Sequence, residues 1–421
     1  MRLLFNASNL KSSGGLVILE QLLPAFLAYE AETGQNDFTW PSASSAQGNI
    51  DSLLLYHHPD VTPQVKAWIE ALPTAAQGRI EAIPFREPDG LRRFYWEQVT
   101  LPRIIQLRQV DVLFSFGNTG PLRPGCRQIL YLQQSIPYTQ YQPRNHWLKW
   151  IRFQWMYGFL INLAQLGSQR IVVPTRWLVQ PMREAIVFRK PASAYRVSLP
   201  GLPGWPNDSP NGGQRAISAA EQALLDTLSM SRKMGTRILL YPCNLAPYKN
   251  IMALLEAVHI LNTQMQHFQL ILTFNEASAE YFPCKQAILT AVAQCPANRV
   301  VLAGSFSRAG LRQLYGLTDV LVFPSLVETL GLPLMEAMAL GIPVVALDGR
   351  TVSDRSTLAA FARDICGDAA IYAPPGQTSV LASQIHQVLR DLTLALRLGQ
   401  AGLQRAGSFS WEQHVRDILG P

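Results

Sequence analysis

Two carboxylates in one short segment are the residues of this chain best placed to do chemistry. The segment 323–346 reads FPSLVETLGLPLMEAMALGIPVVA and places Glu328 and Glu336 eight residues apart. We expect Glu328 on a loop and Glu336 about one turn into the helix that follows. Each carboxylate oxygen accepts hydrogen bonds from hydroxyl groups. The pair can therefore contact two different parts of one extended, hydroxyl-rich ligand such as a sugar.

The elements around this pair also predict a phosphate-binding site. Pro333 fits the first turn of the expected helix, and Gly341 ends that helix. The backbone just before the helix has unpaired N–H groups, which attract a phosphate together with the helix dipole. Glycine in that stretch lets a ligand approach the backbone closely. The stretch consists of Thr329, Leu330 and Gly331.

The same segment resembles the E-x7-E signature of the family 4 glycosyltransferases, which are retaining enzymes with the GT-B fold. It matches nearly the whole family pattern, but Thr329 stands where glycine is usual and Leu330 where phenylalanine is usual. The resemblance implies that Glu336 would bind the ribose of a nucleotide-sugar donor. It also implies that Glu328 would contact the donor sugar or its phosphate region, and we assign it a catalytic role.

A second match lies upstream, where residues 241–250 read YPCNLAPYKN. In the family, an arginine and a lysine of this loop hold the donor diphosphate. Lys249 matches the lysine and would act catalytically as a counter-ion for the leaving diphosphate. Asn244 is a donor-binding candidate that stands where the arginine is usual, although an amide lacks the charge of a guanidinium. The YP…KN form favours GDP-mannose as the donor.

The resemblance extends to three further places. Gly14 and Gly15 open a helix after the first expected strand, next to the donor phosphate and the acceptor in similar enzymes. Phe306 is a candidate contact for the nucleotide base, with packing in the interior as the open alternative. Gln133 or Gln134 lies where many relatives carry a histidine beside the reacting sugar. Glutamine can bind a sugar hydroxyl but cannot act as a base at pH 7.

Short apolar strands alternate with stretches of helical period, which predicts parallel βαβ units with both sheet faces covered. The pattern is clearest in the C-terminal half, with strands expected at 237–242, 268–274, 299–303, 319–324 and 342–347. The N-terminal half shows it less clearly, with strands expected at 3–5, 111–115, 128–132 and 170–174. With the resemblance, this predicts an α/β protein of the GT-B fold, in which two Rossmann-like domains with parallel sheets face a central cleft.

The boundaries of these domains follow from the same pattern and from a stretch rich in Pro, Gly, Asn and Ser. We expect an acceptor-binding domain at 1–198, a linker region at 199–235 and a nucleotide-sugar-binding domain at 236–404. The tail 405–421 is expected to form a helix that packs back on the N-terminal domain.

The net charge of +7 is concentrated in one part of the chain. Residues 100–196 hold 13 Lys and Arg but two acidic residues, a net +11. Within them, the segment 123–159 interleaves basic residues with Trp and Tyr, a composition that suits an anionic membrane surface. Packing of these aromatic residues in the interior is the alternative. No nucleic-acid-recognition motif accompanies the segment, so nucleic acid is not an expected partner.

Other features narrow the class of protein. The five cysteines are scattered and include no C-x-x-C pair, which argues against a disulfide framework and a zinc site. The N-terminus does not read as a signal peptide and no run is apolar for about 20 residues. We therefore expect a cytoplasmic protein, located at the inner face of the membrane if the segment 123–159 binds lipid.

These observations predict a glycosyltransferase that moves a sugar from a nucleotide diphosphate-sugar to a glycan or lipid-linked acceptor in polysaccharide biosynthesis. The anomeric configuration would be retained, and neither a metal nor another cofactor is expected. One alternative is a non-catalytic GT-B-like protein that binds or scaffolds, because Asn244 and the glutamines depart from the family pattern. A nucleotide-sugar epimerase is a further alternative, disfavoured because it would need acid and base groups that this pattern lacks.

Overall fold

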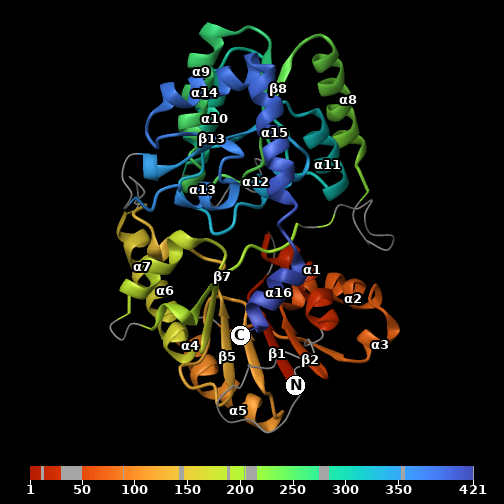
Figure 1. The fold of residues 1–421 in the computed structure, drawn as a ribbon, viewed down its shortest axis with the longest axis vertical. Coiled ribbons are helices and arrows are strands. Elements are labelled where there is room, and N and C mark those ends of the chain that lie inside the picture. The colour runs from red at the N-terminus through yellow and green to blue at the C-terminus, as the bar shows by residue number, and fades with distance from the viewer. Residues whose placement is uncertain are drawn as a thin grey trace.

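The chain folds into two α/β domains, which lie one above the other in Figure 1. The structure is a computed structural model. It describes residues 1–10, 14–29, 50–88, 90–141, 147–186, 190–202, 204, 216–274, 284–351 and 356–420. No side chain is described for residues 90, 91, 147–153 and 351.

The N-terminal domain is built on a parallel sheet, which has seven strands within the described residues, in the order β3-β2-β1-β4-β5-β6-β7. The central strands are apolar and buried on both faces, as a parallel sheet between two helix layers requires. The strands are β1 (Arg2–Ala7), β2 (Ser52–His57), β3 (Ile80–Pro84), β4 (Val112–Ser115), β5 (Arg127–Tyr131), β6 (Arg170–Val173) and β7 (Tyr195–Val197).

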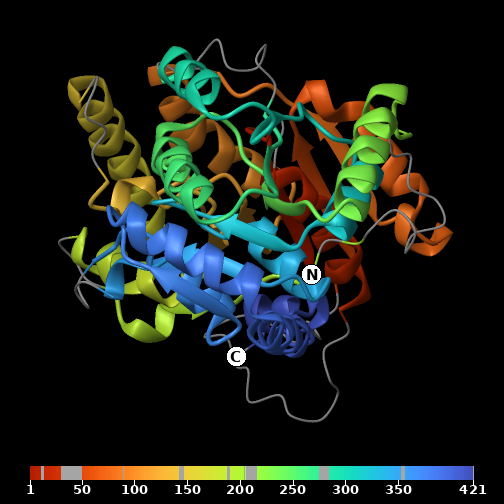
Figure 2. The same cartoon turned by 90° about the horizontal axis from the view of Figure 1, so that it is seen from above.

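The C-terminal domain has a second parallel sheet, with six strands among the described residues, in the order β10-β9-β8-β11-β12-β13. Seen from above, helices lie on both faces of this sheet (Figure 2). The strands are β8 (Arg237–Tyr241), β9 (Phe268–Leu272), β10 (Val300–Leu302), β11 (Val320–Phe323), β12 (Val344–Leu347) and β13 (Ala370–Ala373). The predicted fold class, two Rossmann-like domains with parallel sheets, is confirmed.

Helices connect the strands in both domains. In the N-terminal domain these are α1 (Gly14–Ala28), α2 (Thr62–Glu70), α3 (Thr74–Gln77), α4 (Gly90–Tyr95), a π-helix η2 (Trp96–Thr100), α5 (Leu101–Leu107), α6 (Trp147–Gly167) and α7 (Val179–Glu184). The C-terminal domain contains α9 (Ile251–Gln264), α10 (Lys285–Gln294), α11 (Arg308–Leu317), α12 (Leu332–Ala339), α13 (Ala360–Cys366), α14 (Thr378–Arg390) and α15 (Leu392–Ala406). Short 3-10 turns include η1 (Pro59–Val61), η3 (Ile136–Tyr138), η4 (Arg176–Leu178), η5 (Ala192–Ala194), η7 (Pro247–Lys249) and η9 (Gly349–Thr351).

Two helices follow the points at which the chain passes from one domain to the other. The helix α8 (Ala219–Lys233) occupies part of the range expected as a linker and packs on α11 of the C-terminal domain. Its start is fixed by a capping box of Ser218 and Glu221. The last helix, α16 (Trp411–Leu419), lies against α1 and β7 of the N-terminal domain (Figure 1). There Arg170 Nη1 donates to the carbonyl oxygen of Ile418 at 2.6 Å.

Candidate functional site

The two domains meet where loops leave the carboxyl ends of their strands. After β5, the backbone N–H of Ser135 donates to Thr329 Oγ1 at 3.1 Å, and Thr329 Oγ1 lies 3.2 Å from Ser135 Oγ. A small apolar cluster beside this contact joins Ile136 and Tyr141 of the N-terminal domain to Val327 of the C-terminal domain. Thr329, which stands where the family has glycine, thus supplies a polar contact between the domains.

The predicted phosphate-binding backbone lies at the start of α12. Gly331 is the N-cap residue and has φ 68°, a left-handed conformation that favours glycine. Leu330 is buried and anchors the turn in the core. Across the interface, a Cβ added to Gly14 would lie 3.1 Å from Leu332 Cδ1. The glycine at the start of α1 therefore lets the N-termini of two helices from different domains approach each other.

Glu328 and Lys249 form an ion pair beside this helix start. Only 15% of the Glu328 side chain and 13% of the Lys249 side chain are exposed. Ser325 Oγ also donates to Glu328 Oε1 at 2.8 Å. Burial lowers the pKa of Lys249, but the adjacent Glu328 carboxylate more than offsets it, so the net shift is upward. Lys249 is therefore a fixed cation at neutral pH.

Glu336 is buried in α12 and held by two groups from α11. Arg308 Nη1 donates to Glu336 Oε1 at 2.5 Å, and the Tyr315 hydroxyl donates to Glu336 Oε2 at 2.9 Å. The second guanidinium nitrogen of Arg308 reaches the carbonyl oxygen of Gly204 at 3.4 Å. Arg308 and Tyr315 were not predicted from the sequence. They lie seven residues apart on one face of a helix, but nothing in that spacing identifies the partner.

The remaining donor-side candidates lie on loops. Asn244 is exposed, and its side-chain oxygen accepts from the backbone N–H of Ala246 at 3.2 Å, which fixes the turn after β8. Phe306 packs partly buried against the core, and a Cβ on Gly310 would lie 3.0 Å from its ring. Its predicted contact with a nucleotide base stays a prediction.

The two glutamines lie after β5 on the N-terminal side of the interface. A Cβ added to Gly15 would lie 3.0 Å from Gln133 Oε1, so the second glycine of the pair makes room for this amide. The backbone N–H of Gln133 donates to Asn118 Oδ1 at 2.5 Å. Gln134 Oε1 accepts from the backbone N–H of Ile136 at 3.4 Å. Gln133 therefore lies beside the helix start that the glycine pair forms.

Within the described ranges, no group of three or more His, Cys, Asp or Glu side chains is arranged to hold a metal ion. None of the helices that the structure describes is long and apolar enough to cross a membrane.

The sequence of the C-terminal domain matches a known family. Residues 236–391 match the family described as Glycosyl transferases group 1. The O-antigen chain mannosyltransferase B of Escherichia coli is 29% identical over 177 residues, which cover 41% of this chain and 42% of that protein. The sulfoquinovosyl transferase of Arabidopsis thaliana is 30% identical over 118 residues, or 28% of this chain and 22% of that protein. The matched stretches thus span less than half the length of these relatives.

The fold of the whole chain is shared with solved structures of low sequence identity. Anabaena HepE, in crystals with UDP and glucose, has a TM-score of 0.65 at 16% identity and covers 99% of this chain and 98% of its own. WaaG, a glycosyltransferase involved in lipopolysaccharide biosynthesis, has a TM-score of 0.60 at 12% identity over the full length of both chains. The chain has the GT-B fold of these proteins, and residues 236–391 of its C-terminal domain match the group 1 glycosyl transferases.

Proposed function

We propose that this protein is a retaining glycosyltransferase that moves a sugar from a nucleotide diphosphate-sugar to a glycan or lipid-linked acceptor without a metal ion. The observation that carries the proposal is the pair of carboxylates on either side of the α12 start. Glu328 is held by Lys249, and Glu336 is held by Arg308 and Tyr315, all within a group 1 glycosyl transferase domain.

The site residues have distinct tasks in this reaction. The bond between the anomeric carbon and the diphosphate oxygen breaks, and the acceptor oxygen forms the new bond on the same face of the sugar. Lys249 and the backbone N–H groups before α12 stabilise the negative charge that develops on the diphosphate. The acceptor's proton passes to the leaving diphosphate, so the absence of a histidine at Gln133 is compatible with transfer.

The two carboxylates orient the donor. Glu336 is rigid because two groups already bind it, and each of its oxygens can accept a further hydrogen bond from a ribose hydroxyl. Glu328 lies on the loop before α12, where the donor sugar would lie next to the diphosphate. Arg308 supplies a second cation on this side of the interface, where Asn244 lacks the charge of the usual arginine.

GDP-mannose is the donor we favour. The YP…KN form of residues 241–250 points to it, and one relative of this chain is a mannosyltransferase. The test is a thermal-shift screen of the full chain against GDP, UDP, ADP and their sugar conjugates, with and without EDTA. We expect one nucleotide series, GDP, to raise the melting temperature regardless of EDTA.

The same screen on two variants tests the site. Lys249→Ala and Glu336→Ala should lose the stabilisation by the nucleotide, whereas Lys233→Ala, which changes an exposed lysine of α8, should keep it. If no nucleotide stabilises the wild-type protein, the transferase proposal is wrong and a non-catalytic binding protein becomes the better description.

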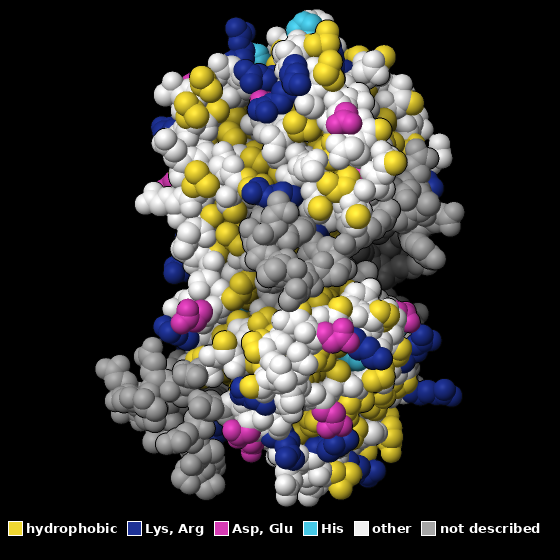
Figure 3. All heavy atoms as spheres, turned by 90° about the vertical axis from the view of Figure 1, so that its right-hand side faces the viewer, with side chains coloured by type: hydrophobic (Ala, Val, Ile, Leu, Met, Phe, Trp, Pro, Cys, Tyr) yellow, Lys and Arg dark blue, Asp and Glu magenta, His cyan; other side chains and the backbone are white. Residues whose placement is uncertain are grey.

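A membrane-bound acceptor is supported by the outer face of α6. Trp155 is 77% exposed, and Met156 and Phe159 are 57% and 58% exposed, so the described aromatic residues of this face do not pack in the interior. The basic residues 123 and 127 lie in the same stretch of chain, while residues 142–146 and the side chains of 147–153 lie outside the described part. On the opposite side, Lys and Arg are scattered in small groups over both domains (Figure 3).

We infer that this face binds the cytoplasmic surface of an anionic membrane. Large exposed aromatic side chains suit the boundary between headgroups and acyl chains, and the basic residues of the segment 123–159 suit anionic headgroups. Vesicles of phosphatidylglycerol and phosphatidylcholine should sediment the wild-type protein, and Trp155→Ser with Phe159→Ser should weaken that binding. Leu396→Ser, which changes an equally exposed residue of α15, is the control. Equal sedimentation of all three proteins would contradict the membrane assignment.

A further inference from the structure

Arg308 of α11 connects the C-terminal domain with the linker between the domains. Its Nη1 donates to Glu336 Oε1 at 2.5 Å, and its Nη2 donates to the carbonyl oxygen of Gly204 at 3.4 Å. Glu336 belongs to α12, whereas Gly204 belongs to the stretch of chain that leaves the N-terminal domain after β7. One planar guanidinium therefore joins the carboxylate that we assign to the ribose with the backbone of the linker.

The N-terminal domain also contributes a carboxylate to the surroundings of Arg308. Burial raises the pKa of Glu20 on α1, and the charge of Arg308 partly offsets that rise. A Cβ added to Gly204 would lie 3.7 Å from Gln21 Oε1, so the linker passes beside the same helix. The charge of Arg308 thus acts on Glu20 of one domain and on Glu336 of the other.

The linker is held here by the second point at which the chain passes between the domains. Trp411, the first residue of α16, donates from Nε1 to the carbonyl oxygen of Leu202 at 2.8 Å. A Cβ added to Gly201 would collide with the Trp411 ring, so the glycine permits this close contact. Figure 1 shows α16 beside α1 of the N-terminal domain. The contact with Trp411 therefore fixes the linker two residues before Gly204.

The two groups that hold Glu336 differ in what else they contact. The Tyr315 hydroxyl donates to Glu336 Oε2 at 2.9 Å, and the Tyr315 side chain is fully buried in α11. Arg308 holds the other oxygen of the same carboxylate but extends to Gly204 as well. The orientation of Glu336 therefore depends on the linker through Arg308.

We propose that Arg308 is a positioning residue that couples nucleotide binding at Glu336 to the placement of the linker. A hydrogen bond weakens steeply when it is misaligned, so the orientation of Glu336 sets its affinity for ribose hydroxyls. Contacts of the linker that lie outside the donor side should therefore change the affinity for the nucleotide. The inference rests on the proposed transferase function, and it assigns a residue that links the donor side to the crossing between the domains.

A double-mutant cycle on the full chain measures this coupling. The readout is calorimetric titration of the nucleoside diphosphate that the thermal-shift screen selects, which we expect to be GDP. Trp411→Phe keeps an aromatic ring against Gly201 but removes the hydrogen bond to Leu202. It should weaken nucleotide binding about threefold when Arg308 is present and leave it unchanged in Arg308→Met. Trp155→Phe, the same substitution at an exposed position of α6, is the matched control and should change nothing in either background.

Tyr315→Phe separates this coupling from a general loosening of Glu336. It also removes one hydrogen bond to that carboxylate, but it leaves the contact between Arg308 and Gly204 in place. Adding Trp411→Phe to this background should therefore still weaken nucleotide binding about threefold. A residue that only held Glu336 locally would give no such difference between the two backgrounds.

Amide hydrogen exchange is the second measurement, and it replaces the cycle if Trp411→Phe fails to fold. The nucleotide should slow the exchange of residues 198–204 in wild type and in Tyr315→Phe. It should not do so in Arg308→Met, even at saturating nucleotide, because the contact with the linker is gone.

The outcomes distinguish this inference from the transferase proposal. If the nucleotide binds but Trp411→Phe has the same effect with and without Arg308, or exchange of the linker slows equally in Arg308→Met, the coupling is absent. The inference is then wrong, while the donor site stands. If no nucleoside diphosphate binds the wild-type protein, the transferase proposal is wrong and the inference falls with it.

Discussion

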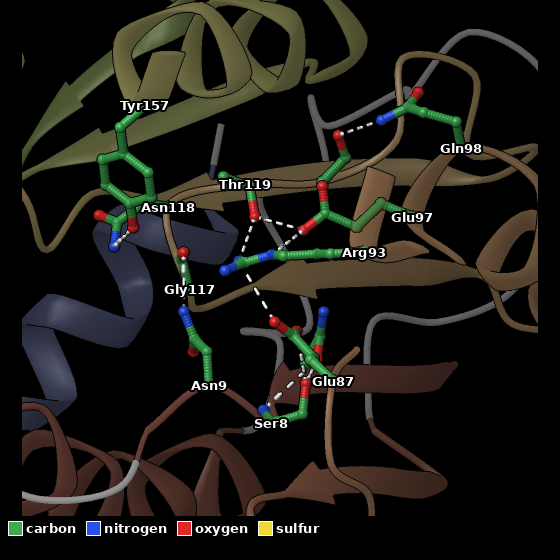
Figure 4. A network of polar contacts seen from close by, with 12 residues as sticks. Ser8, Asn9, Glu87, Arg93, Glu97, Gln98, Gly117, Asn118, Thr119 and Tyr157 are labelled. Carbon is green, nitrogen blue, oxygen red and sulfur yellow. Dashed lines mark hydrogen bonds and ion pairs between the residues drawn. The ribbon is translucent and has the colours of Figure 1, made fainter. Parts of the chain in front are cut away.

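The charged groups of the two domains are built in different ways, although both lie at the carboxyl edge of a parallel sheet. In the C-terminal domain each carboxylate has its own cation, Lys249 for Glu328 and Arg308 for Glu336. In the N-terminal domain one cation, Arg93, serves two carboxylates. In the proposed reaction, the first arrangement places the cation of Lys249 beside the diphosphate. In the second, Arg93 holds two buried carboxylates, and Ser8 and Thr119 donate to them, so the cluster is paired internally (Figure 4).

The two regions also differ in how the chain assembles them. Both donor-side carboxylates come from one strand–loop–helix unit, from β11 to α12, so their spacing is fixed by local structure. In the N-terminal cluster, Arg93 of α4 and Glu97 of η2 are joined by Ser8, Glu87 and Thr119 from loops that are far apart in sequence. The N-terminal cluster therefore depends on the packing of several separate segments, whereas the donor-side carboxylates depend on one local unit.

The largest effect is expected where the donor side loses its cation. Lys249→Met should lower kcat about 10²–10³-fold, because the charge that stabilises the leaving diphosphate is gone. It should also destabilise the fold by about 1–3 kcal/mol, because Glu328 is left buried without its cation. Turnover of the donor and the midpoint of urea unfolding measure the two effects.

A double variant separates these two effects. Lys249→Met with Glu328→Gln removes both charges and should restore much of the stability, since no unpaired charge remains. Activity should stay low, because the cation is still absent. Recovery of activity together with stability would show that the pair is structural and that the contrast between the two regions is wrong.

A smaller effect is expected from the groups that hold Glu336. Arg308→Ala should weaken nucleotide binding about tenfold, and Tyr315→Phe should weaken it by about a few-fold. Each change removes one hydrogen bond that fixes the carboxylate. Calorimetric titration of GDP measures both, with Arg397→Ala on an exposed position of α15 as the control. Tighter nucleotide binding in Arg308→Ala would mean that Arg308 competes with the ribose for Glu336.

The sequence predicted the donor side better than the acceptor side, for a physical reason. Gly331, Pro333 and Gly341 each have a backbone requirement that marks the start or end of α12, so Glu328 and Glu336 could be placed without a structure. Arg308 and Tyr315 could not, because a contact between two helices depends on packing.

The N-terminal half was harder to predict for related reasons. The strand β2 reads SLLLYH, a short apolar run that periodicity alone cannot separate from a helix, and β3 reads IEAIP at a half-exposed edge. Neither strand was predicted. Without them the loops that carry His58 and Glu87 could not be placed side by side, and the N-terminal cluster was missed. The predicted strands of the C-terminal half agree with the structure because their apolar runs alternate with clear helices.

The smallest effect concerns the tail that ties the C-terminal end of the chain to the N-terminal domain. His414 of α16 is buried, with Nδ1 2.7 Å from Ser198 Oγ and Nε2 3.1 Å from the Tyr131 hydroxyl. Burial lowers its pKa from 6.5 to about 3. The unfolded chain therefore binds a proton below pH 6.5 that the folded chain does not, and stability falls as the pH falls from 6.5 toward 3.

This linkage predicts a loss of about 1 kcal/mol between pH 7.5 and pH 5.5. His414→Gln cannot titrate, so it should lose less stability over that interval than wild type, even if it is less stable at pH 7.5. Urea unfolding at both pH values, followed by tryptophan fluorescence, measures the difference. His267→Gln, on an exposed position, should keep the wild-type pH dependence. If His414→Gln loses as much stability as wild type between pH 7.5 and pH 5.5, another group causes the pH dependence. The tail then adds no acid-sensitive contact between the two regions.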